Sequence, residues 1–136
     1  MTKKEINVEL REKAIEVSKN AHSPYSKAKV GCSLLTEDGH YFSGCNVENS
    51  SFGATVCAER NAICQAVAAG HKKLKKIYIY TSYGWPPCGI CRQVMTEFAD
   101  PNLEIIVGNE KGEEKSYLLK EAIPFAYVPE HMEEVK

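Results

Sequence analysis

Two short motifs place three cysteines and one glutamate where they could bind and use a metal ion. The first motif is Cys57-Ala58-Glu59, and the second is Pro87-Cys88-Gly89-Ile90-Cys91. Three thiolates suit zinc and leave its fourth position open, whereas structural zinc sites fill all four positions with protein groups. The ligand count therefore favours a catalytic zinc site. Glu59 is the natural proton carrier for a water bound at the open position.

The helices expected around these motifs explain the spacing of the cysteines. Residues 58–69 read as a helix that stops at Gly70, which would put Cys57 at its N-terminal end. A second helix is expected over residues 88–98, and its i, i+3 spacing puts the second and third cysteines on one face. Helix N-termini present unpaired N–H groups and the positive end of the helix dipole. Both features lower thiol pKa values and favour the thiolates that zinc requires.

The charge of three thiolates needs compensation from outside the ligand set. Three thiolates around one Zn²⁺ leave a net negative charge, which would make a bound water a poorer acid. Arg60 and Gln93 are expected to donate hydrogen bonds to the sulfurs and to withdraw part of that charge.

The remaining cysteines and the histidines are expected to lie outside the zinc site formed by the cysteine motifs. A lone C-x-x-C is often a redox pair or half of a structural zinc knuckle, but the third cysteine with its adjacent Glu59 argues against both. Free cysteines behave as small hydrophobic residues in a core, and this is the role expected for Cys32, Cys45 and Cys64. The histidines lack ligand spacing to the cysteine motifs and are expected on the surface or in loops: His22, His40, His71 and His131.

Length, charge and cysteine usage exclude several classes of protein. The 136 residues are expected to form one domain, residues 1–136. The 17 basic and 18 acidic residues give a net charge of −1 with no basic run, which is not the footprint of a nucleic-acid binder. Cysteines held as thiolates suit a reducing compartment, and no segment has the length of a membrane span. We therefore expect a cytoplasmic protein without nucleic-acid or membrane partners.

The pattern of elements predicts an α/β fold, a three-layer α/β/α sandwich with a mixed, about five-stranded sheet. Thr2-Lys3-Lys4-Glu5 has the form of a capping box, and the first helix is expected to end near Asn20. A hairpin follows, with its turn at residues 37–40. The expected strands are residues 28–36, 41–45, 76–81, 103–107 and, more weakly, 114–117, and a short helix is expected at residues 118–121.

From about Ser23 to Pro124 the motifs of this chain resemble those of the small homotetrameric cytidine deaminases. The motifs that carry the resemblance are Pro24-Tyr25-Ser26, Gly44-Cys45-Asn46-Val47-Glu48-Asn49, Cys57-Ala58-Glu59-Arg60 and Pro87-Cys88-Gly89-Ile90-Cys91-Arg92-Gln93-Val94. The resemblance implies the cytidine deaminase fold, one zinc per subunit on the three cysteines, and Glu59 as proton shuttle. It implies hydrolysis of cytidine and deoxycytidine to uridine and deoxyuridine with release of ammonia. It also implies a homotetramer whose sites are shared between subunits.

The same resemblance implies which residues hold the nucleoside. It assigns Asn46 and Glu48 to the ribose hydroxyls, and it adds Val47 and Ala58 to the substrate-binding residues. The chemistry of the first pair is compatible with this role, because an amide and a carboxylate two residues apart project to the same side of an extended segment. Such a pair can both accept hydrogen bonds from a diol and donate to it.

Three positions depart from the family pattern. Ala28 stands where these enzymes usually carry a phenylalanine packed against the base, and Trp85 replaces a small or hydroxyl residue. Tyr127 stands where they usually have a phenylalanine that reaches into a neighbouring subunit's site. Ala28 and Tyr127 resemble blasticidin S deaminase, which acts on a larger cytosine-bearing antibiotic but lacks the acidic residue of the ribose pair. Glu48 therefore favours a nucleoside substrate. The lack of an aromatic ring at Ala28 would leave space for cytidines enlarged at N4, unless a neighbouring side chain fills the gap. Deamination of a blasticidin-like compound is the alternative function.

Two other functional classes share parts of this pattern. An enzyme that edits single-stranded nucleic acid could use the same zinc chemistry, but such enzymes generally carry a His-x-Glu first motif and need a basic channel. A non-catalytic zinc module would have no use for an unligated carboxylate beside an open position. Cys57 as the first ligand argues against the first class, and Glu59 argues against the second.

Overall fold

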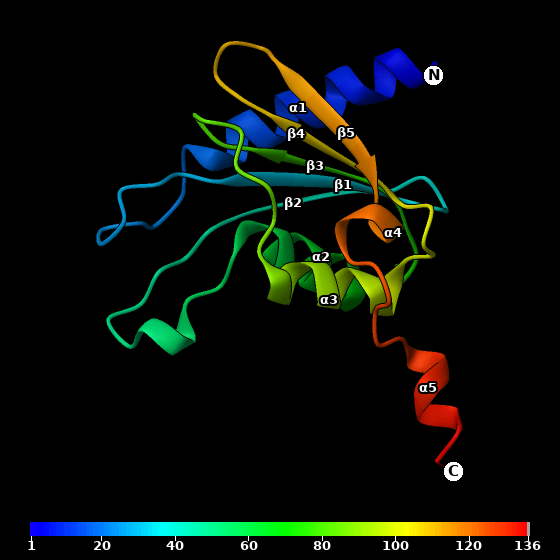
Figure 1. The fold of residues 1–136 in the computed structure, drawn as a ribbon. Coiled ribbons are helices and arrows are strands. Elements are labelled where there is room, and N and C mark those ends of the chain that lie inside the picture. Colours follow the sequence, from blue (N-terminus) through cyan, green and yellow to red (C-terminus); the bar gives the residue numbers. More distant parts are fainter. Residues whose placement is uncertain (136) are drawn as a thin grey trace.

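A mixed sheet forms the centre of the fold (Figure 1). In the computed structural model, which describes residues 1–135, the five strands have the order β2-β1-β3-β4-β5. Strands β3 and β4 are parallel, and the other neighbouring pairs are antiparallel. The strands are β1 (Gly31–Thr36), β2 (Tyr41–Cys45), β3 (Leu74–Tyr80), β4 (Glu104–Gly108) and β5 (Glu114–Leu118). The mixed five-stranded sheet predicted from the sequence is confirmed.

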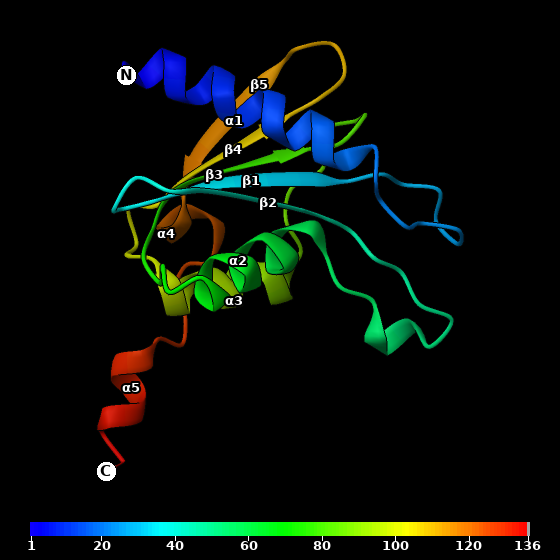
Figure 2. The same ribbon diagram turned by 180° about the vertical axis from the view of Figure 1, so that it is seen from behind.

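Helices cover both faces of this sheet (Figures 1 and 2). Helix α1 crosses one face, and α2 and α3 lie side by side on the other, while α5 extends away from the sheet. The helices are α1 (Lys3–Ser18), α2 (Ala58–Ala68), α3 (Gly89–Phe98), α4 (Leu119–Ala122) and α5 (Pro129–Glu133), with a 3-10 turn η1 (Phe52–Ala54). This is the three-layer arrangement expected from the alternation of strands and helices.

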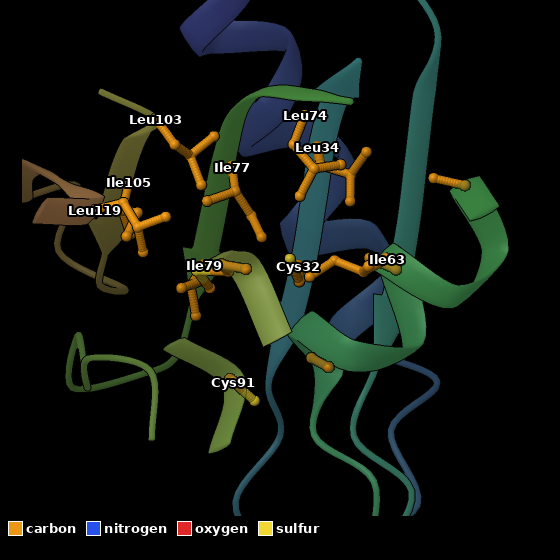
Figure 3. Close-up of a cluster of buried hydrophobic side chains, with 14 of the residues drawn as sticks. Cys32, Leu34, Ile63, Leu74, Ile77, Ile79, Cys91, Leu103, Ile105 and Leu119 are labelled. Carbon is orange, nitrogen blue, oxygen red and sulfur yellow. The ribbon is translucent and has the colours of Figure 1, made fainter. Parts of the chain in front are cut away.

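Each face of the sheet has its own hydrophobic cluster. On the α1 face, Leu10 and Ala14 pack against Leu35, Tyr78 and Ile106. The cluster on the other face is larger and includes buried side chains from β1, β3, β4, α2 and α3. Figure 3 shows part of it, with Ile63 of α2 reaching toward Cys32 of β1, Ile77 and Ile79 on β3, and Cys91 at the edge of the group. Cys91 thus belongs to the larger of the two hydrophobic clusters, and Cys57 packs against it.

The start of the first helix follows the prediction, whereas the first strand is shorter than expected. The capping box is present, with the Glu5 N–H donating to Thr2 Oγ1 (3.1 Å) and the Thr2 N–H to Glu5 Oε1 (3.2 Å). Strand β1 begins at Gly31, because the preceding residues are held by a side chain in place of a neighbouring strand. Asn46 donates to the Ala28 carbonyl and accepts from the Val30 N–H, both at 2.9 Å.

Two glycines allow the helices to approach the sheet closely. A Cβ on Gly44 would lie 2.6 Å from the backbone nitrogen of Ala62 in α2, and one on Gly31 would lie 1.8 Å from the carbonyl oxygen of Ala14 in α1. Real Cβ atoms do not approach backbone this closely. Each glycine therefore sets the distance of one helix from the sheet.

One cysteine assignment from the sequence is wrong. Cys32 is fully buried as expected, and Cys45 is partly buried, but Cys64 is exposed. The buried face of α2 is formed by Ala62, Ile63 and Ala66. Each residue turns a helix by about 100°, so Cys64 projects past the edge of that face.

Within residues 1–135 there is no helix long and apolar enough to cross a membrane.

Candidate active site

The cysteine motifs meet where α2 and α3 begin. Cys57 is the N-cap residue of α2, Cys88 is the N-cap residue of α3, and Cys91 lies in the first turn of α3. Neither N-cap cysteine uses its side chain to cap its helix. The sulfurs are therefore available as ligands, at the helix ends where the dipole favours negative charge.

The separations of the three sulfurs fit a zinc ion. The Sγ atoms of Cys57 and Cys88 are 3.8 Å apart, and all three Sγ atoms lie within 4.8 Å of one another. Sulfurs bound at 2.3 Å to a tetrahedral ion would be separated by about 3.8 Å. The donor set is soft and contains only three protein groups, as in a zinc site with one open position.

Arg60 lies against the sulfurs, as the compensation of their charge requires. Its Nη2 is 3.4 Å from Cys57 Sγ and 3.5 Å from the Thr55 carbonyl oxygen. Donation from Cys91 and from Arg60 lowers the pKa of Cys57 to about 5, whereas the pKa of Cys91 is raised because its thiol donates to Cys57. Arg60 Nε is buried and has no hydrogen-bond partner among residues 1–135.

Gln93 does not donate to the sulfurs, contrary to the prediction. Its Nε2 donates to the Tyr127 carbonyl oxygen (2.7 Å) and to Thr96 Oγ1 (3.1 Å). The reason is helical geometry, because Gln93 follows Cys91 by two residues and thus lies about 200° around the helix from it. Gln93 instead ties the C-terminal segment to α3.

Glu59 combines deep burial with a position next to the sulfur cluster. Its side chain lines the same cavity as Cys57 and Cys88, and the residue is 4% exposed. Burial, followed by the nearby Cys57 thiolate, raises the pKa of Glu59 to about 7. A carboxyl group with this pKa exists in both protonation states near neutral pH, which is the condition for carrying protons in both directions.

A small cavity connects these groups to the predicted ribose-binding residues. Its volume is about 220 Å³. The side chains around it combine the metal-type ligands, the buried carboxyl, apolar walls and polar groups. The lining residues are Val30, Asn46, Glu48, Thr55, Cys57, Ala58, Glu59, Ile79, Thr81, Trp85, Pro86 and Cys88. The fold therefore brings Asn46, Glu48, Ala58 and Trp85 together with Glu59 and two of the three cysteines.

Hydrogen bonds hold the two polar residues of this wall in place. Glu48 Oε1 accepts from the backbone N–H groups of Tyr25 (3.0 Å) and Ser26 (3.1 Å), and Oε2 accepts from the Ser26 hydroxyl. These hydrogen bonds, with that of the Ser26 hydroxyl the strongest, lower the pKa of Glu48. Glu48 is therefore a fixed anionic acceptor, and Asn46 beside it is 7% exposed and held by Ala28 and Val30.

Val47 does not line the cavity, although it was expected among the substrate-binding residues. Its side chain is 44% exposed, and its backbone pairs with Val56 through two hydrogen bonds of 2.9 Å. Residues 46 and 48 face one side of this extended segment, so residue 47 faces the other. Its side chain is therefore turned away from the sulfurs.

The three positions that depart from the family pattern have different surroundings. Ala28 lines a second cavity of about 300 Å³, which shares Thr81 and Trp85 with the first. Trp85 is 49% exposed and stacks on Tyr83 at a centroid distance of 5.6 Å. Tyr127 lies on the segment between α4 and α5, is 56% exposed, and lines neither cavity.

Two residues position parts of the site, although the sequence did not predict this role for them. Ser26 fixes Glu48, and it lies in the Pro24-Tyr25-Ser26 motif, whose signal is visible in the sequence. Thr81 is 4% exposed, and its Oγ1 accepts from the N–H groups of Gly84 (2.7 Å) and Trp85 (2.8 Å). The one sequence feature that could have pointed to Thr81 is its position immediately after β3, at the end of the strand that faces the N-termini of α2 and α3.

Comparison with known proteins agrees with this geometry. The family model described as "Cytidine and deoxycytidylate deaminase zinc-binding region" matches residues 4–107. A cytidine deaminase of Halalkalibacterium halodurans is 38% identical over 125 residues, which is 90% of this chain and 95% of the relative. A probable cytidine deaminase of Dictyostelium discoideum is 45% identical over 102 residues, covering 70% of this chain and 69% of the relative.

A solved structure extends the likeness to three dimensions. The crystal structure of the cytidine deaminase from Burkholderia pseudomallei matches with a TM-score of 0.86 at 40% identity, covering 93% of this chain and 100% of the other. These findings confirm the resemblance read from the motifs. The chain belongs to the family of cytidine and deoxycytidylate deaminases with a zinc-binding region.

Proposed function

We propose that this protein hydrolyses cytidine and deoxycytidine to uridine and deoxyuridine and releases ammonia. The observation that carries the proposal is the cavity in which Glu59, buried and outside the cysteine cluster, meets Cys57 and Cys88 on one side and Asn46 and Glu48 on the other. The first side supplies the chemistry of deamination, and the second offers hydrogen bonds that suit a sugar diol.

The chain's own residues perform the proton transfers in this proposal. Zinc held by Cys57, Cys88 and Cys91 would supply a Lewis-acidic position that makes water a good nucleophile at neutral pH. Glu59 accepts a proton from the attacking water and delivers it to N3 of the pyrimidine. It then takes the remaining proton from the new C4 hydroxyl and passes it to the amino group, which leaves C4 as ammonia while C4 becomes a carbonyl. Glu48 and Asn46 hold the ribose, which fixes the base next to Glu59.

The decisive experiment compares candidate substrates with one zinc-loaded preparation. Cytidine, deoxycytidine, blasticidin S and a cytosine-containing oligonucleotide are incubated with the enzyme, and deamination is followed by the change in ultraviolet absorbance. We expect turnover of both nucleosides and none of the oligonucleotide, because the chain has no basic run to hold a phosphate backbone. Absence of nucleoside turnover by protein with one zinc per chain would refute the proposal.

The cavity beside Ala28 supports a broader substrate range. It shares the lining residues Thr81 and Trp85 with the sulfur-containing cavity, so Ala28 lies close to the proposed position of the pyrimidine. We propose that this space accepts cytidines enlarged at the exocyclic nitrogen. Blasticidin S, a larger cytosine-bearing compound, is the alternative substrate for the same space.

Comparison with Ala28→Phe tests the broader range. The measured quantity is kcat/KM for an N4-alkyl cytidine divided by kcat/KM for cytidine, because this ratio reports differential binding of the two transition states. A phenylalanine should fill the added space and lower the ratio by about 10- to 200-fold, the discrimination typical of a methylene-sized misfit. An unchanged ratio would show that the second cavity has no part in substrate choice.

We also propose a homotetramer in which neighbouring subunits complete each site. The proposal is supported by the large apolar side chains that a single chain leaves exposed, among them Tyr25, Phe52, Trp85, Ile90, Phe125 and Tyr127. Tyr127 is the residue proposed to reach a neighbouring site. Light scattering coupled to gel filtration should give four times the 15.2 kDa chain mass, whereas an active monomer would contradict this assembly.

A further inference from the structure

A second cluster of metal-ligating side chains lies at the opposite end of α2 from Cys57. Asp38 and His40 belong to the turn between β1 and β2, and His71 follows the C-terminus of α2. His71 Nδ1 is 2.7 Å from Asp38 Oδ2, and His40 Nδ1 is 3.6 Å from Asp38 Oδ1. One ligand atom from each residue lies within 4.8 Å of the other two. Asp38 and His40 are neighbours in one turn, but His71 follows Asp38 by 33 residues, and only the fold brings it to them.

The backbone on both sides of this cluster is fixed. The Glu37 N–H donates to the Lys73 carbonyl (2.9 Å), which ties the turn directly to the segment that follows α2. The His71 N–H donates to the Ala66 carbonyl (2.9 Å), which fixes His71 to the last turn of the helix. The two segments that supply the ligands are therefore held at a set separation, and the ligand side chains start from defined positions.

The carboxylate of the cluster is also oriented and ionised. The Thr36 hydroxyl donates to Asp38 Oδ1 (2.6 Å), in the way that outer groups orient the ligands of known metal sites. Hydrogen bonds from Thr36 and His71 lower the pKa of Asp38 to about 2. Asp38 is therefore an anionic oxygen donor at every pH at which a histidine is neutral and able to bind a metal.

We propose that Asp38, His40 and His71 form a second metal site, which takes a divalent ion of the zinc, cobalt or nickel type. Two imidazoles and one carboxylate form a ligand set used for such ions, and water would complete the coordination. The site differs in chemistry from the three-sulfur site, because its donors are nitrogen and oxygen. The proposal of this second site does not depend on the proposed deaminase function.

The rearrangement needed for binding is small. Two donors held at about 2.1 Å by a tetrahedral ion are about 3.4 Å apart. The ion would replace the proton shared by His71 and Asp38, and that pair would separate slightly. His40 is stacked on His71 with ring centroids 3.9 Å apart, so its ring must rotate to aim a nitrogen at the ion. The His40 side chain is 54% exposed, which leaves room for this rotation.

Binding would cross-link the β1–β2 turn to the end of α2. An ion that binds only the folded chain stabilises it in proportion to the logarithm of the free metal concentration. The effect would be an increase in melting temperature that continues after the three-sulfur site is filled. The zinc-loaded protein is therefore the correct starting material for a test.

The test titrates protein that already holds one zinc per chain with further Zn²⁺ in a calorimeter and, separately, with Co²⁺ under absorption spectroscopy. We expect one additional ion per chain. The added cobalt should show ligand-field bands without the sulfur-to-metal charge-transfer band of a thiolate site. His40→Gln and His71→Gln should each weaken this binding by at least about 10- to 100-fold, the loss that removal of an outer partner alone can cause. His131→Gln, which removes a histidine far along the chain, is the matched control.

Three results would overturn the proposal. The first is saturation at one ion per chain at free zinc near 100-fold above the protein concentration. The second is unchanged affinity for the added ion in both His40→Gln and His71→Gln. The third is a charge-transfer band that grows with the added cobalt, because this would assign the ion to the cysteines. An increase in melting temperature that the two variants abolish would support the site independently of any activity measurement.

Discussion

A carboxyl group lies beside metal-type ligands at each end of α2, Glu59 on the helix itself and Asp38 on the adjacent β1–β2 turn. The pKa values of these two groups are shifted in opposite directions. At the N-terminal end, Glu59 is 4% exposed next to the cysteines, and its pKa is raised to about 7. At the C-terminal end, Asp38 is exposed next to two histidines, and its pKa is lowered to about 2. Burial is the main cause of the raised pKa of Glu59, whereas the hydrogen bond from the Thr36 hydroxyl is the main cause of the lowered pKa of Asp38.

This contrast shows how burial determines what a carboxyl group can do. Removing water from Glu59 penalises its charged form, and the adjacent thiolate adds to the penalty. Asp38 keeps its water and gains the Thr36 hydroxyl, which favours its charged form. The first group can exchange protons near neutral pH, whereas the second is a permanent anion. The predictions below test each side of this comparison.

The largest effect is expected from Cys57→Ala, which removes one of the three sulfurs at the N-terminal end of α2. The zinc content should fall well below one ion per chain and deamination should be lost, because two thiolates bind the metal far less strongly than three. Helix formation itself should change little, since the Cys57 side chain makes no capping hydrogen bond. Metal analysis and the absorbance assay measure the two quantities.

Cys64→Ala is the control for this change, because it alters an exposed cysteine on the same helix. It should keep both zinc and activity. A Cys57→Ala protein with full zinc content would show that the three sulfurs are not the ligand set.

Glu59→Gln is expected to have the next largest effect. The zinc content should remain at one ion per chain while kcat falls by at least about 10² to 10⁴-fold, the usual contribution of one acid–base group. The amide keeps the size of the side chain but cannot carry protons. Glu97→Gln, on the exposed side of α3, is the matched control and should be close to the parent. Loss of zinc together with activity would instead make Glu59 part of the metal site.

The two cysteine motifs illustrate what the sequence allows one to predict. The metal-binding role of the cysteines could be predicted because each motif lies within one helical turn, and local helix geometry places Cys88 and Cys91 together. The same local reasoning failed for Gln93 and Val47, where the face on which a side chain lies decides its partner. A motif match shows that a residue is present but does not show which way its side chain points.

The cluster at the other end of α2 shows a different limit. Asp38, His40 and His71 have no spacing that resembles a metal motif, and the histidines were expected only as surface or loop residues. Their proximity depends on the pairing of β1 with β2 and on the place where α2 ends against that hairpin. Contacts between two turns of this kind need the tertiary structure.

The packing of α2 between its two ends gives a third prediction. Gly44→Ala would place a Cβ 2.6 Å from the Ala62 nitrogen, so α2 must shift away from β2. Overpacking of this kind costs about 1–3 kcal/mol of folding stability. Gly53→Ala is the control, because a Cβ there meets nothing within 4 Å. Urea unfolding of the zinc-loaded proteins measures the difference, and equal stability of the two variants would show that α2 is not fixed by this contact.

The smallest effect concerns the ionisation of Asp38. Because the Thr36 hydroxyl is the main cause of its low pKa, Thr36→Val should raise that pKa from about 2 toward the ordinary value of 3.8. Since the pKa is lowered in the folded state, the stability contributed by Asp38 is fully present above pH 3.8 and is lost as the pH falls toward about 2. The variant should therefore lose this contribution at a higher pH than the parent. Thr96→Val, which removes a hydroxyl elsewhere, should leave the Asp38 pKa unchanged.

The carboxyl carbon signal of Asp38 reports this ionisation directly by NMR, in buffers without added metal and over the pH range in which the folded spectrum persists. At pH 3.8 the parent should be almost entirely ionised at Asp38, because that pH lies well above its pKa of about 2. Thr36→Val should be partly protonated at the same pH. Half-protonation of the parent at pH 3.8 would mean that the hydroxyl does not stabilise the anion. Asp38 would then differ from Glu59 only in its exposure to water, and the contrast between the two ends of α2 would reduce to burial alone.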